Sequence, residues 1–564
     1  MTGRLIYVTG PSGTGVKTAL NKYVRHLRES GIGDADLPKI VCLEDRLKEL
    51  ATEQVKAVLA YKDVTLFRVL QLPKPILEDL WLQAFEDALA EAKEARTQGR
   101  DALLTFHATW YHHQNREYIS AADFQRLAQD DARADMMATL IDDIYDVRRR
   151  LSEPHGLFEN PLDDSLSELE DTVLKLILIL DWRAVEQLVS EKIATVTTPP
   201  RSHFLLAVKH PISTLQALLA SPVNNPEARH TVYLSHPISD PKSMLHSGRA
   251  AEASTVIGDI QTIAGKLRAG LIVFEPTSID EARFDHQVTL SDGRTAPFPV
   301  LGERWPLAAE ERYLLFTPPH GDPANDFGEQ WTMRATEIRD AARDGRGTPY
   351  ENELTSSYGL LAILRDAILR HINLRDHKLI DQSNWLVVYR PFFLGRLATG
   401  VQEEVMYHDR LVRGGKSEQP CLVLHPPSDE RLRPRETLRS YLVNCLQEGR
   451  LSNADDVALN GAVDTADPDT LASDDTDLVT GQRIRGILDS AGMDFKKARR
   501  KSALGKDPAS AAEEENEKTG REFRERLHSY LGDLAPGCIH LEESDLSPLA
   551  FADRVVKRVG RSAR

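Results

Sequence analysis

The chain has 564 residues, of which 41% are hydrophobic, and at roughly 150 residues per domain this length predicts about three or four globular units. Lysine and arginine number 70 against 86 aspartate and glutamate residues, which gives a formal net charge of −16. This negative net charge argues against a surface that binds nucleic acid or anionic lipid by long-range electrostatic attraction, so we expect no stable nucleic-acid binding. A small, locally positive site remains compatible with it.

Cysteine content and hydropathy argue against a disulfide-rich or membrane protein. The four cysteines are widely separated and form no C-x-x-C pair: Cys42, Cys421, Cys445 and Cys538. This pattern predicts neither a disulfide framework nor a cysteine-based zinc site. Residues 1–9 are strand-like without a secretory signal segment, and the longest apolar run, residues 173–182, contains charges and is too short to span a bilayer. We therefore expect a protein of the reducing cytoplasm that does not enter a membrane.

A glycine-rich loop stands near the start of the chain, between a strand and a helix. The β-branched and aromatic run Leu5–Thr9 leads into Gly10–Thr18, and a helical pattern begins at Ala19. Glycines let backbone N–H groups turn around a phosphate, and the following helix N-terminus and a lysine add positive charge. The loop thus predicts a nucleotide phosphate site. Val16 stands between Gly15 and the lysine, which departs from the usual spacing, so a glycine-rich turn without a ligand remains the alternative.

Further apolar runs follow and alternate with helical stretches. These runs are residues 39–43, 102–107, 136–141 and 204–208. Five strands alternating with helices are typical of a parallel sheet wound with α-helices. We therefore place a first α/β domain at residues 1–220.

Residues 1–220 resemble the P-loop nucleoside-monophosphate kinase group, in particular its adenylate-kinase-like branch. The resemblance rests on the glycine-rich loop, on the central strand Leu103–Thr109, on Leu140–Asp143 with the nearby Arg148–Arg150, and on Asp181–Arg183. The closing strand, residues 204–211, is also similar.

This resemblance implies that ATP or another nucleoside triphosphate binds at the loop together with Mg2+, and that a nucleotide kinase activity is open. The residues assigned to the phosphates are Gly10, Gly13, Gly15, Lys17 and Thr18, with Thr18 also reaching the magnesium ion of the nucleotide. A kinase would need arginines around the transferring phosphoryl group. The candidates are Arg148, Arg149, Arg150 and Arg183, although a solvated helix face explains any one of them as well.

A second α/β domain is expected at residues 228–450, after the proline-containing loop Ser221–Pro226. Its expected elements are strands at residues 231–237, 270–276 and 385–389, a helix near 250–269 and a long helical stretch through 365–373. We expect a second doubly wound parallel sheet of the Rossmann-like kind.

The second domain resembles the nucleoside 2-deoxyribosyltransferase family, which includes enzymes that hydrolyse the N-glycosidic bond of nucleotides. Val232–Pro237 is similar to the family's opening strand, whose Tyr and small residues line the sugar pocket. Arg375–Asn384 is similar to its pattern of aspartates before a strand. Thr399–Tyr407 is similar to the glycine-containing helix start that presents the catalytic glutamate.

Aligned in this way, the family's catalytic roles fall on Tyr233, Asp376 and Glu404. Cleaving a base from a sugar passes through an oxocarbenium-like state, so Glu404 would act as nucleophile at C1′ and Asp376 as the acid, as in retaining glycosidases. Tyr233 would hydrogen-bond Glu404 and hold it in position. Asp376 should be partly buried beside another acid, because a raised pKa helps it protonate the leaving base. Taken singly, Tyr233 also fits a core aromatic and Asp376 a helix-surface acid. This cleavage requires no cofactor.

Several positions depart from the family or compete with these assignments. Asn384 stands where the pattern has a second aspartate, and Ala398 stands where many members have one six residues before the catalytic glutamate. Glu403 competes with Glu404, since adjacent helical residues point about 100° apart and only one can face the site. The spacing from Gly400 favours Glu404. Further substrate-binding positions are expected at Ser235, Asn384 and Gly400.

The remaining chain shows a change of charge but no recognisable chemistry. Residues 451–482 are rich in Asp, Ala and Thr and contain eight Asp without any Lys or Arg between them, which indicates an acidic flexible linker. Residues 483–564 are expected to form a C-terminal helical or α/β segment, with a strand at 538–541 and a helix at 549–559.

These patterns together predict a nucleotide-processing enzyme that cleaves or exchanges the N-glycosidic bond of a nucleoside or nucleotide and is coupled to a P-loop nucleotide-binding domain. Nucleosides or nucleotides are the expected partners, and we expect a homo-oligomer. The setting is nucleotide metabolism or nucleotide-depleting defence. The alternative is a nucleotide-sensing regulatory protein without turnover at one or both sites, which the departures at Val16, Asn384 and Ala398 motivate.

Overall fold

The structure is a computed structural model, and it describes the chain in the following ranges. They are residues 3–59, 65–112, 115–166, 168–220, 230–238, 250–279, 281, 287–289, 295–297, 349–390, 392–393, 396–415, 421–424, 539–542 and 547–562. The expected acidic linker, residues 451–482, and the expected loop at Ser221–Pro226 lie outside the described residues.

The described residues contain two five-stranded sheets in which neighbouring strands pair parallel. The first has the order β2-β3-β1-β6-β7 and consists of β1 (Leu5–Thr9), β2 (Lys39–Cys42), β3 (Ala102–Thr105), β6 (Met136–Ile141) and β7 (His203–Ala207). The second has the order β16-β15-β12-β8-β9 and consists of β8 (Thr231–Ser235), β9 (Ile272–Phe274), β12 (Trp385–Tyr389), β15 (Cys421–Leu424) and β16 (Ile539–Glu542). The α/β class and its parallel sheets, as expected from the sequence, are confirmed.

Three short antiparallel pairs accompany the sheets in the described part of the chain. They are β4 (Trp110–His112) with β5 (Glu117–Ile119), β10 (Gln287–Thr289) with β11 (Thr295–Pro297), and β13 (Phe392–Phe393) with β14 (Arg396–Leu397).

Helices connect the strands of both sheets. Around the first sheet lie α1 (Val16–Glu29), α2 (Leu43–Leu59), α3 (Leu66–Leu70), α4 (Lys74–Thr97), α5 (Phe124–Leu127), η1 (Asp130–Ala132), α6 (Ile144–Leu151), α7 (Glu168–Thr197) and α8 (Ile212–Ala220). With the second sheet come α10 (Ala250–Arg268), η3 (Pro276–Ser278), α13 (Pro349–Asp381), α14 (Thr399–Arg413) and α21 (Pro548–Ser562).

The central strands are buried along their whole length, which explains their continuous apolar runs. Every residue of β1, β6, β8 and β12 is buried. Strands covered on both faces need apolar residues at consecutive positions, rather than the alternation of a half-exposed strand. For this reason the continuous apolar runs of the sequence predicted these strands correctly.

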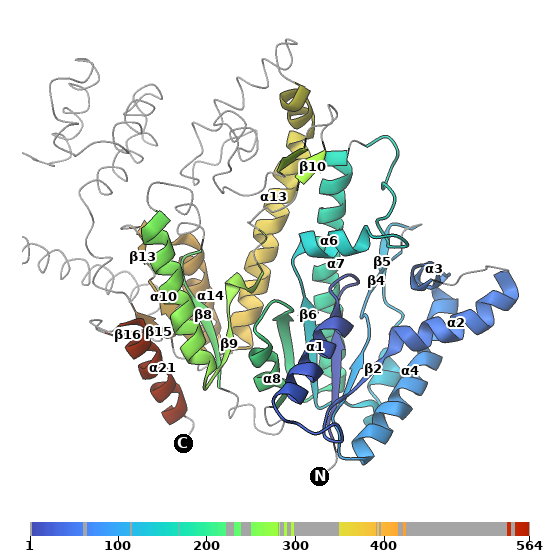
Figure 1. Cartoon of the computed structure of the whole chain (residues 1–564), viewed down its shortest axis with the longest axis horizontal. Coiled ribbons are helices and arrows are strands. Elements are labelled where there is room, and N and C mark those ends of the chain that lie inside the picture. The colour runs from blue at the N-terminus through green and yellow to red at the C-terminus, as the bar shows by residue number, and fades with distance from the viewer. Residues whose placement is uncertain are drawn as a thin grey trace, which may run out of the picture.

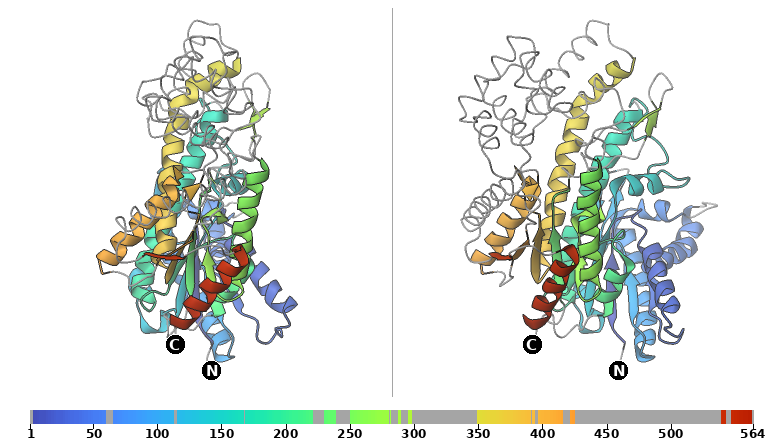
Figure 2. Two further views of the ribbon diagram at one scale, coloured as in Figure 1. Left: turned by 90° about the vertical axis from the view of Figure 1, so that its left-hand side faces the viewer. Right: turned by 60° about the vertical axis from the view of Figure 1, so that its left-hand side comes forward.

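The two sheets are joined by packed helices and a shared core (Figures 1 and 2). The long helices α7 and α13 pack side by side, with Val173 and Leu176 of α7 in one apolar cluster with Leu364 and Ile368 of α13. A second cluster contains residues of both sheets. In addition, the amide of Gln382, just after α13, exchanges hydrogen bonds of 2.8 Å with the backbone N–H and C=O of Leu205 in the edge strand β7. The second sheet therefore packs against the first.

The C-terminal strand and helix complete the second sheet. The strand β16 pairs parallel with β15, and α21 packs on α10 through buried residues that include Phe551 and Val555. The expected strand and helix near residues 538–541 and 549–559 are thus present. Their place in the second sheet was not expected, because the sequence separates them from β15 by more than 100 residues.

In both sheets the first strand in chain order lies in the interior of the sheet, and later strands are added on both sides of it. In the second sheet β8 is followed by β9 on one side, while β12, β15 and β16 continue on the other. In the first sheet the chain passes from β1 to β2 and β3 on one side, and then to β6 and β7 on the other. Open α/β sheets bind ligands outside the carboxyl ends of strands at such a switch point. Ligand sites are therefore expected at the carboxyl ends of β1 and β6 and of β8 and β12.

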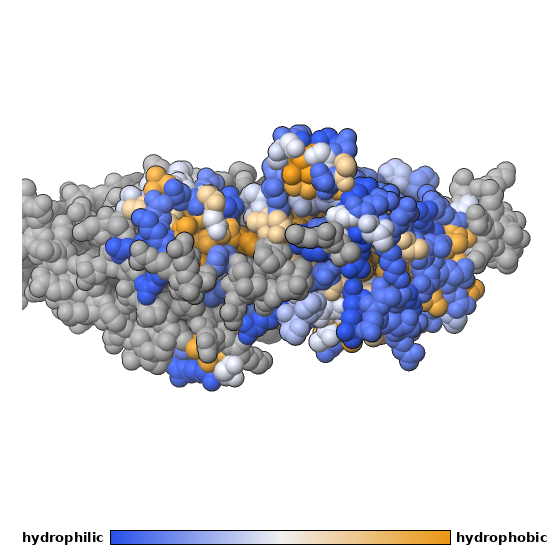
Figure 3. All heavy atoms as spheres, turned by 90° about the horizontal axis from the view of Figure 1, so that it is seen from below, coloured by the Kyte–Doolittle hydropathy of each residue, from blue (hydrophilic) through white to orange (hydrophobic). Residues whose placement is uncertain are grey.

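The described residues on the face at the lower edge of the molecule are mostly hydrophilic (Figure 3). Within the described ranges, no helix has both the length and the apolar character that crossing a membrane would require.

Candidate functional site

Glu404 lies on α14 with its side chain turned into the protein. Glu404 is 7% exposed, whereas the neighbouring Glu403 is exposed. The flanking residues Val401 and Val405 are buried and belong to the shared core, so the apolar face of α14 carries Glu404 inward. Of the two competing glutamates, Glu404 therefore lies on the buried face of α14 and Glu403 on its exposed face.

Two residues of β8 hold the Glu404 carboxylate. Tyr233 Oη donates a hydrogen bond of 2.6 Å to Oε1, and Ser235 Oγ donates one to Oε2. Alternate residues of a strand point to the same face, so the spacing of Tyr233 and Ser235 aims both hydroxyls at one carboxylate. Both residues are completely buried. The expected hydrogen bond between Tyr233 and Glu404 is present. Ser235, which was expected to bind substrate, donates to this carboxylate, and its contact with a substrate stays a prediction.

Asp376 lies near this carboxylate on α13 and pairs with its neighbour. Arg375 Nε donates a hydrogen bond of 2.9 Å to Asp376 Oδ1, and both side chains are nearly inaccessible to solvent. Arg375 Nη1 also donates to the backbone carbonyl of Ile279, at 2.8 Å. Asp376 is therefore a buried acid rather than a helix-surface one.

Burial raises the pKa values of both acids of this site, Glu404 and Asp376, and the charge of Asp376 raises that of Glu404 further. Burial, together with the nearby charge of Asp376, raises the pKa of Glu404 to about 8, although the hydrogen bonds from Ser235 and Tyr233 act in the opposite sense. Burial also raises the pKa of Asp376, against the lowering effect of Arg375. The expected arrangement, a buried Asp376 beside another acid, is confirmed. Two acids in one dry site titrate as a pair.

The other two residues expected to bind substrate are Asn384 and Gly400. Asn384 is at the amino end of the strands, where its Oδ1 accepts hydrogen bonds from the Thr231 hydroxyl at 2.8 Å and the Thr231 backbone N–H at 3.2 Å. Thr231 and Ser235 are the opposite ends of β8, about 13 Å apart at the rise of a strand. The structure therefore does not bring Asn384 to the Glu404 site. Gly400 is in the first turn of α14, where an added Cβ would meet no atom within 4 Å, so packing does not require a glycine there.

Tyr407 supports α14 from one turn after Glu404. Its ring stacks on His377 of α13, with ring centroids 3.8 Å apart, and its hydroxyl donates to both carboxylate oxygens of Asp381, at 3.0 and 2.9 Å. These contacts fix α14 against α13, the two helices that carry Glu404 and Asp376.

The glycine-rich loop, residues 10–18, follows β1 as expected and leads into α1. Gly13 and Gly15 have φ angles of 83° and 78°, the left-handed region that favours glycine. At Gly10 a Cβ would lie 2.5 Å from the Leu140 carbonyl oxygen, so close packing between β1 and β6 requires this glycine. Its N–H donates to the buried carboxylate of Glu186. Gly10 therefore has a structural role, whereas Gly13 and Gly15 shape the loop.

The start of α1 has the features of an anion site. Its N-cap, Gly15, forms no side-chain capping bond, and no acidic residue occurs in the first turn. Thr14 Oγ1 is buried and has no hydrogen-bond partner among the described residues. Lys17 pairs with Asp45 of α2 at 2.5 Å, and Thr18 is exposed on the same helical turn. The sequence did not single out Thr14, because a threonine within such a loop is not distinctive.

One of the four candidate arginines reaches the loop. Arg150 Nη1 donates to the carbonyls of Gly13 at 2.5 Å and Thr14 at 3.2 Å, and its Nη2 donates to Asp142 at 2.6 Å. Asp142 and the next residue follow β6, beside the loop. The other arginines are engaged elsewhere. Arg148 donates to Thr172, Arg149 pairs with Asp146 on the outside of α6, and Arg183 binds Glu281.

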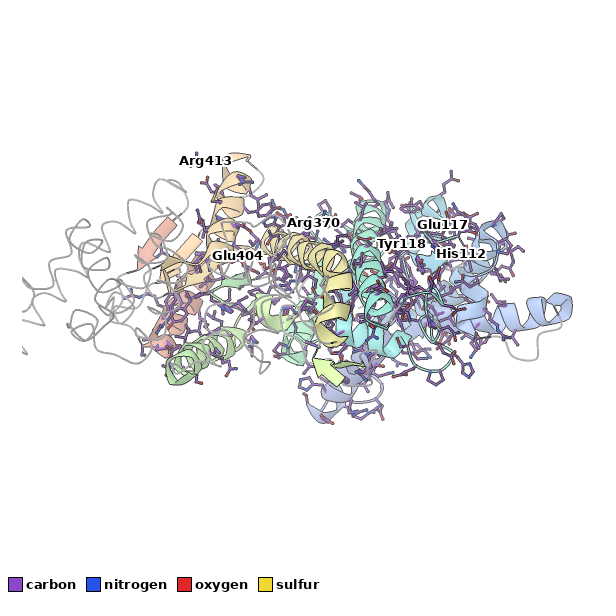
Figure 4. The ribbon with its side chains drawn as sticks, turned by 90° about the horizontal axis from the view of Figure 1, so that it is seen from above. His112, Glu117, Tyr118, Arg370, Glu404 and Arg413 are labelled. Atoms are coloured by element: carbon purple, nitrogen blue, oxygen red, sulfur yellow. The ribbon has the colours of Figure 1, made fainter. Side chains whose placement is uncertain are left out.

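Histidine and acidic side chains form no metal centre in the described part of the chain. His107 bridges the loop, with Nδ1 donating to the Gly10 carbonyl at 2.5 Å and Nε2 3.2 Å from Ser12 Oγ. His112 lies in the β4–β5 hairpin, and Figure 4 shows it on the opposite side of α7 and α13 from Glu404. His112 is thus remote from the Glu404 site.

A buried glutamate that the sequence did not indicate joins the two sheets. Glu281, beyond β9, is completely buried and accepts hydrogen bonds from both Nη atoms of Arg183 on α7, one of them 2.9 Å long. The backbone N–H of Ile144 also donates to it, at 3.3 Å. Glu281 is far from its partners in sequence, and no spacing rule connects it with them.

Comparison with known proteins does not assign the chain to a family. No model of a protein family matches it, and no curated protein does.

Proposed function

We propose that the protein cleaves or exchanges the N-glycosidic bond of a nucleoside or nucleotide at Glu404. The observation that carries this proposal is the buried Glu404 carboxylate, held through both oxygens by Tyr233 and Ser235 beside the acid Asp376. The site lies at the carboxyl ends of the central strands, where parallel sheets bind ligands. A carboxylate beside a second acid is the pair that glycosidic cleavage uses.

In the proposed reaction, Glu404 attacks C1′ of the sugar while the bond between C1′ and the base nitrogen breaks. The electron pair of that bond leaves with the base, and Asp376 supplies the proton that the base takes up. Water or a second base then attacks C1′, releases the Glu404 carboxylate and returns a proton to Asp376. Tyr233 and Ser235 keep the carboxylate oriented for attack. We assign residues 228–450, with the C-terminal strand and helix, to a doubly wound deoxyribosyltransferase-like domain.

For residues 1–220 we propose a P-loop domain that binds a nucleoside triphosphate with Mg2+ at residues 10–18. The left-handed glycines, the uncapped start of α1 and the buried Thr14 hydroxyl support this proposal. Binding without phosphoryl transfer is favoured by Lys17, whose ammonium group pairs with Asp45. This pairing also keeps open a second candidate function, a nucleotide-sensing protein without turnover. We further propose that the protein is cytoplasmic and homo-oligomeric.

The proposal is tested by incubating the protein with ribo- and deoxynucleosides, their phosphates and NAD, and measuring free base by chromatography. We expect base release by the wild-type protein and a loss of at least about 100-fold in Glu404→Gln. The matched control is Glu403→Gln, one residue away on the solvent side of α14, which should keep the wild-type rate. If no substrate is cleaved while nucleotides still bind, the regulatory function is correct instead.

A further inference from the structure

Helix α6 is attached at its two ends to different sites. At its C-terminal end, Arg150 donates to the carbonyls of Gly13 and Thr14 in the glycine-rich loop. At its N-terminal end, the backbone N–H of Ile144 donates to the Glu281 carboxylate, and Tyr145 Oη donates to the Glu281 carbonyl at 2.9 Å. The helix is only eight residues long, so a displacement at one end is transmitted to the other.

Glu281 in turn contacts the helices that line the junction between the sheets. Its carboxylate forms a two-pronged ion pair with Arg183 of α7. Two residues before it, the Ile279 carbonyl accepts a hydrogen bond from Arg375 of α13. Arg375 also holds Asp376, the acid beside Glu404. A series of contacts therefore runs from the loop through α6, Glu281 and Arg375 to Asp376, whose charge acts on Glu404.

The charged groups around Glu281 and Glu404 interact strongly because they are buried away from water. Glu281 faces Arg183 of α7, Arg375 and His371 of α13, and Asp143 of α6. Glu404 faces Asp376 and Arg375 of α13 and the hydroxyls of Tyr233 and Ser235 of β8. Coulomb interactions between buried groups are several times stronger than those in water. Burial and the Glu281 charge raise the pKa of Asp143, the N-cap of α6, to about 7, which illustrates this coupling.

We propose that a nucleoside phosphate bound at residues 10–18 regulates the Glu404 site through α6 and the buried Glu281 carboxylate. This inference rests on the proposed function of both sites. Phosphate oxygens bind a guanidinium group more strongly than neutral carbonyl oxygens do, so the ligand draws Arg150 away from Gly13 and Thr14. The shift of α6 changes the contacts of Ile144 and Tyr145 with Glu281, and thereby the position of Arg375 and Asp376.

The proposed coupling predicts a proton exchange on ligand binding that can be measured without turnover. If the ligand changes the electrostatic environment of Glu404, its binding must be accompanied by uptake or release of protons at that site, because linkage is reciprocal. This proton exchange is measured by calorimetric titration of the full-length protein in buffers of different ionisation enthalpy. The probe is a non-hydrolysable ATP analogue with Mg2+ at pH 8, close to the raised pKa of Glu404.

We expect the number of protons exchanged on binding to differ between the wild-type protein and Glu404→Gln. The same change is expected in Glu281→Gln, which keeps the shape of the side chain and removes its charge. The matched control is Arg149→Ala, because Arg149 points outward from the same helix and pairs with Asp146. This variant should exchange protons as the wild type does. Where Glu281→Gln does not fold, Tyr145→Phe removes only the hydroxyl that donates to the Glu281 carbonyl.

The effect on activity is measured separately. The analogue should change the rate of base release at pH 7 by about fivefold or more in the wild type, a typical size for allosteric coupling, and by less in Glu281→Gln. Ligand binding with identical proton exchange in wild type and Glu404→Gln would overturn the coupling, as would absence of binding at the loop. Absence of base release with an intact proton signal would instead refute the proposed reaction and leave the coupling standing.

Discussion

At the scale of single residues, the protonation of Glu404 is the property that decides how the proposed reaction depends on pH. A nucleophile must be ionised, and the pKa of Glu404 is raised to about 8, chiefly by burial and then by Asp376. Below that pH most of the protein carries a neutral Glu404, so base release should increase as the pH rises toward 8. Burial also raises the pKa of Asp376, and base release should fall once both acids are ionised, because the leaving base then has no proton donor.

The serine that donates to Glu404 provides a direct test of this pH dependence. Its hydrogen bond stabilises the carboxylate and so lowers the pKa of Glu404. Ser235→Ala should therefore raise the pKa of Glu404. The part of the pH profile in which kcat/KM rises with pH should move to higher pH. The matched control is Ser190→Ala, because Ser190 is a completely buried serine of α7 whose hydroxyl hydrogen-bonds to Thr9 of the first sheet. An unchanged pH profile in Ser235→Ala would contradict the assigned role.

Residues whose role follows from local spacing could be predicted from the sequence, and those whose role follows from tertiary contacts could not. The alternation of Tyr233 and Ser235 and the helical phase of Glu404 are local, and the expected bond between Tyr233 and Glu404 is present. Asn384 was expected at the site because of its sequence neighbourhood. It lies at the other end of the strands, since a residue that precedes a strand faces the amino edge of the sheet.

At the scale of elements, the C-terminal helix α21 is expected to stabilise the second sheet. Phe551 is completely buried against α10, while Leu549 on the same helix is 52% exposed. Phe551→Ala should lower the free energy of unfolding by about 3–5 kcal/mol because it leaves a cavity. Leu549→Ala should change it by less than about 0.5 kcal/mol. Denaturant unfolding measures both, and equal effects would contradict the packing of α21 on α10.

Strands were easier to predict than their order. The continuous apolar runs at residues 5–9, 136–141 and 385–389 all correspond to buried central strands. The order of strands depends instead on crossovers that no local pattern encodes. The clearest case is β16, which joins the second sheet although it follows β15 by more than 100 residues.

At the scale of the whole molecule, the buried ion pair between Arg183 and Glu281 ties the two sheets together. Removing one partner leaves the other charge buried without compensation, so Arg183→Met should destabilise the protein by about 3–5 kcal/mol. Replacing both, as in Arg183→Met with Glu281→Leu, removes the orphaned charge and should restore much of that loss. Calorimetric or denaturant unfolding gives both values. A double variant as unstable as the sum of the single ones would contradict the pairing.

The division of the molecule was predicted only in part. The pattern of strands and helices indicated two α/β halves, whereas length alone suggested three or four units, and the described residues contain two five-stranded parallel sheets. The pattern could not reveal that α7, α13 and Glu281 pack the halves against each other, because these contacts join residues about 100 or more positions apart. The acidity of the chain also says little about the sites, since eight of the Asp residues lie in the stretch of residues 451–482.

The central claim, that Glu404 attacks the sugar, is tested most directly by the mass of the intermediate. A nucleoside with fluorine at C2′ slows breakdown of a glycosyl-enzyme, because the fluorine destabilises the oxocarbenium-like transition state. We predict that the wild-type protein gains the mass of the fluorosugar, that peptide mapping places it on Glu404, and that Glu404→Gln gains nothing. Release of the base without any adduct, or an adduct on another residue, would contradict the assignment of Glu404 as the nucleophile.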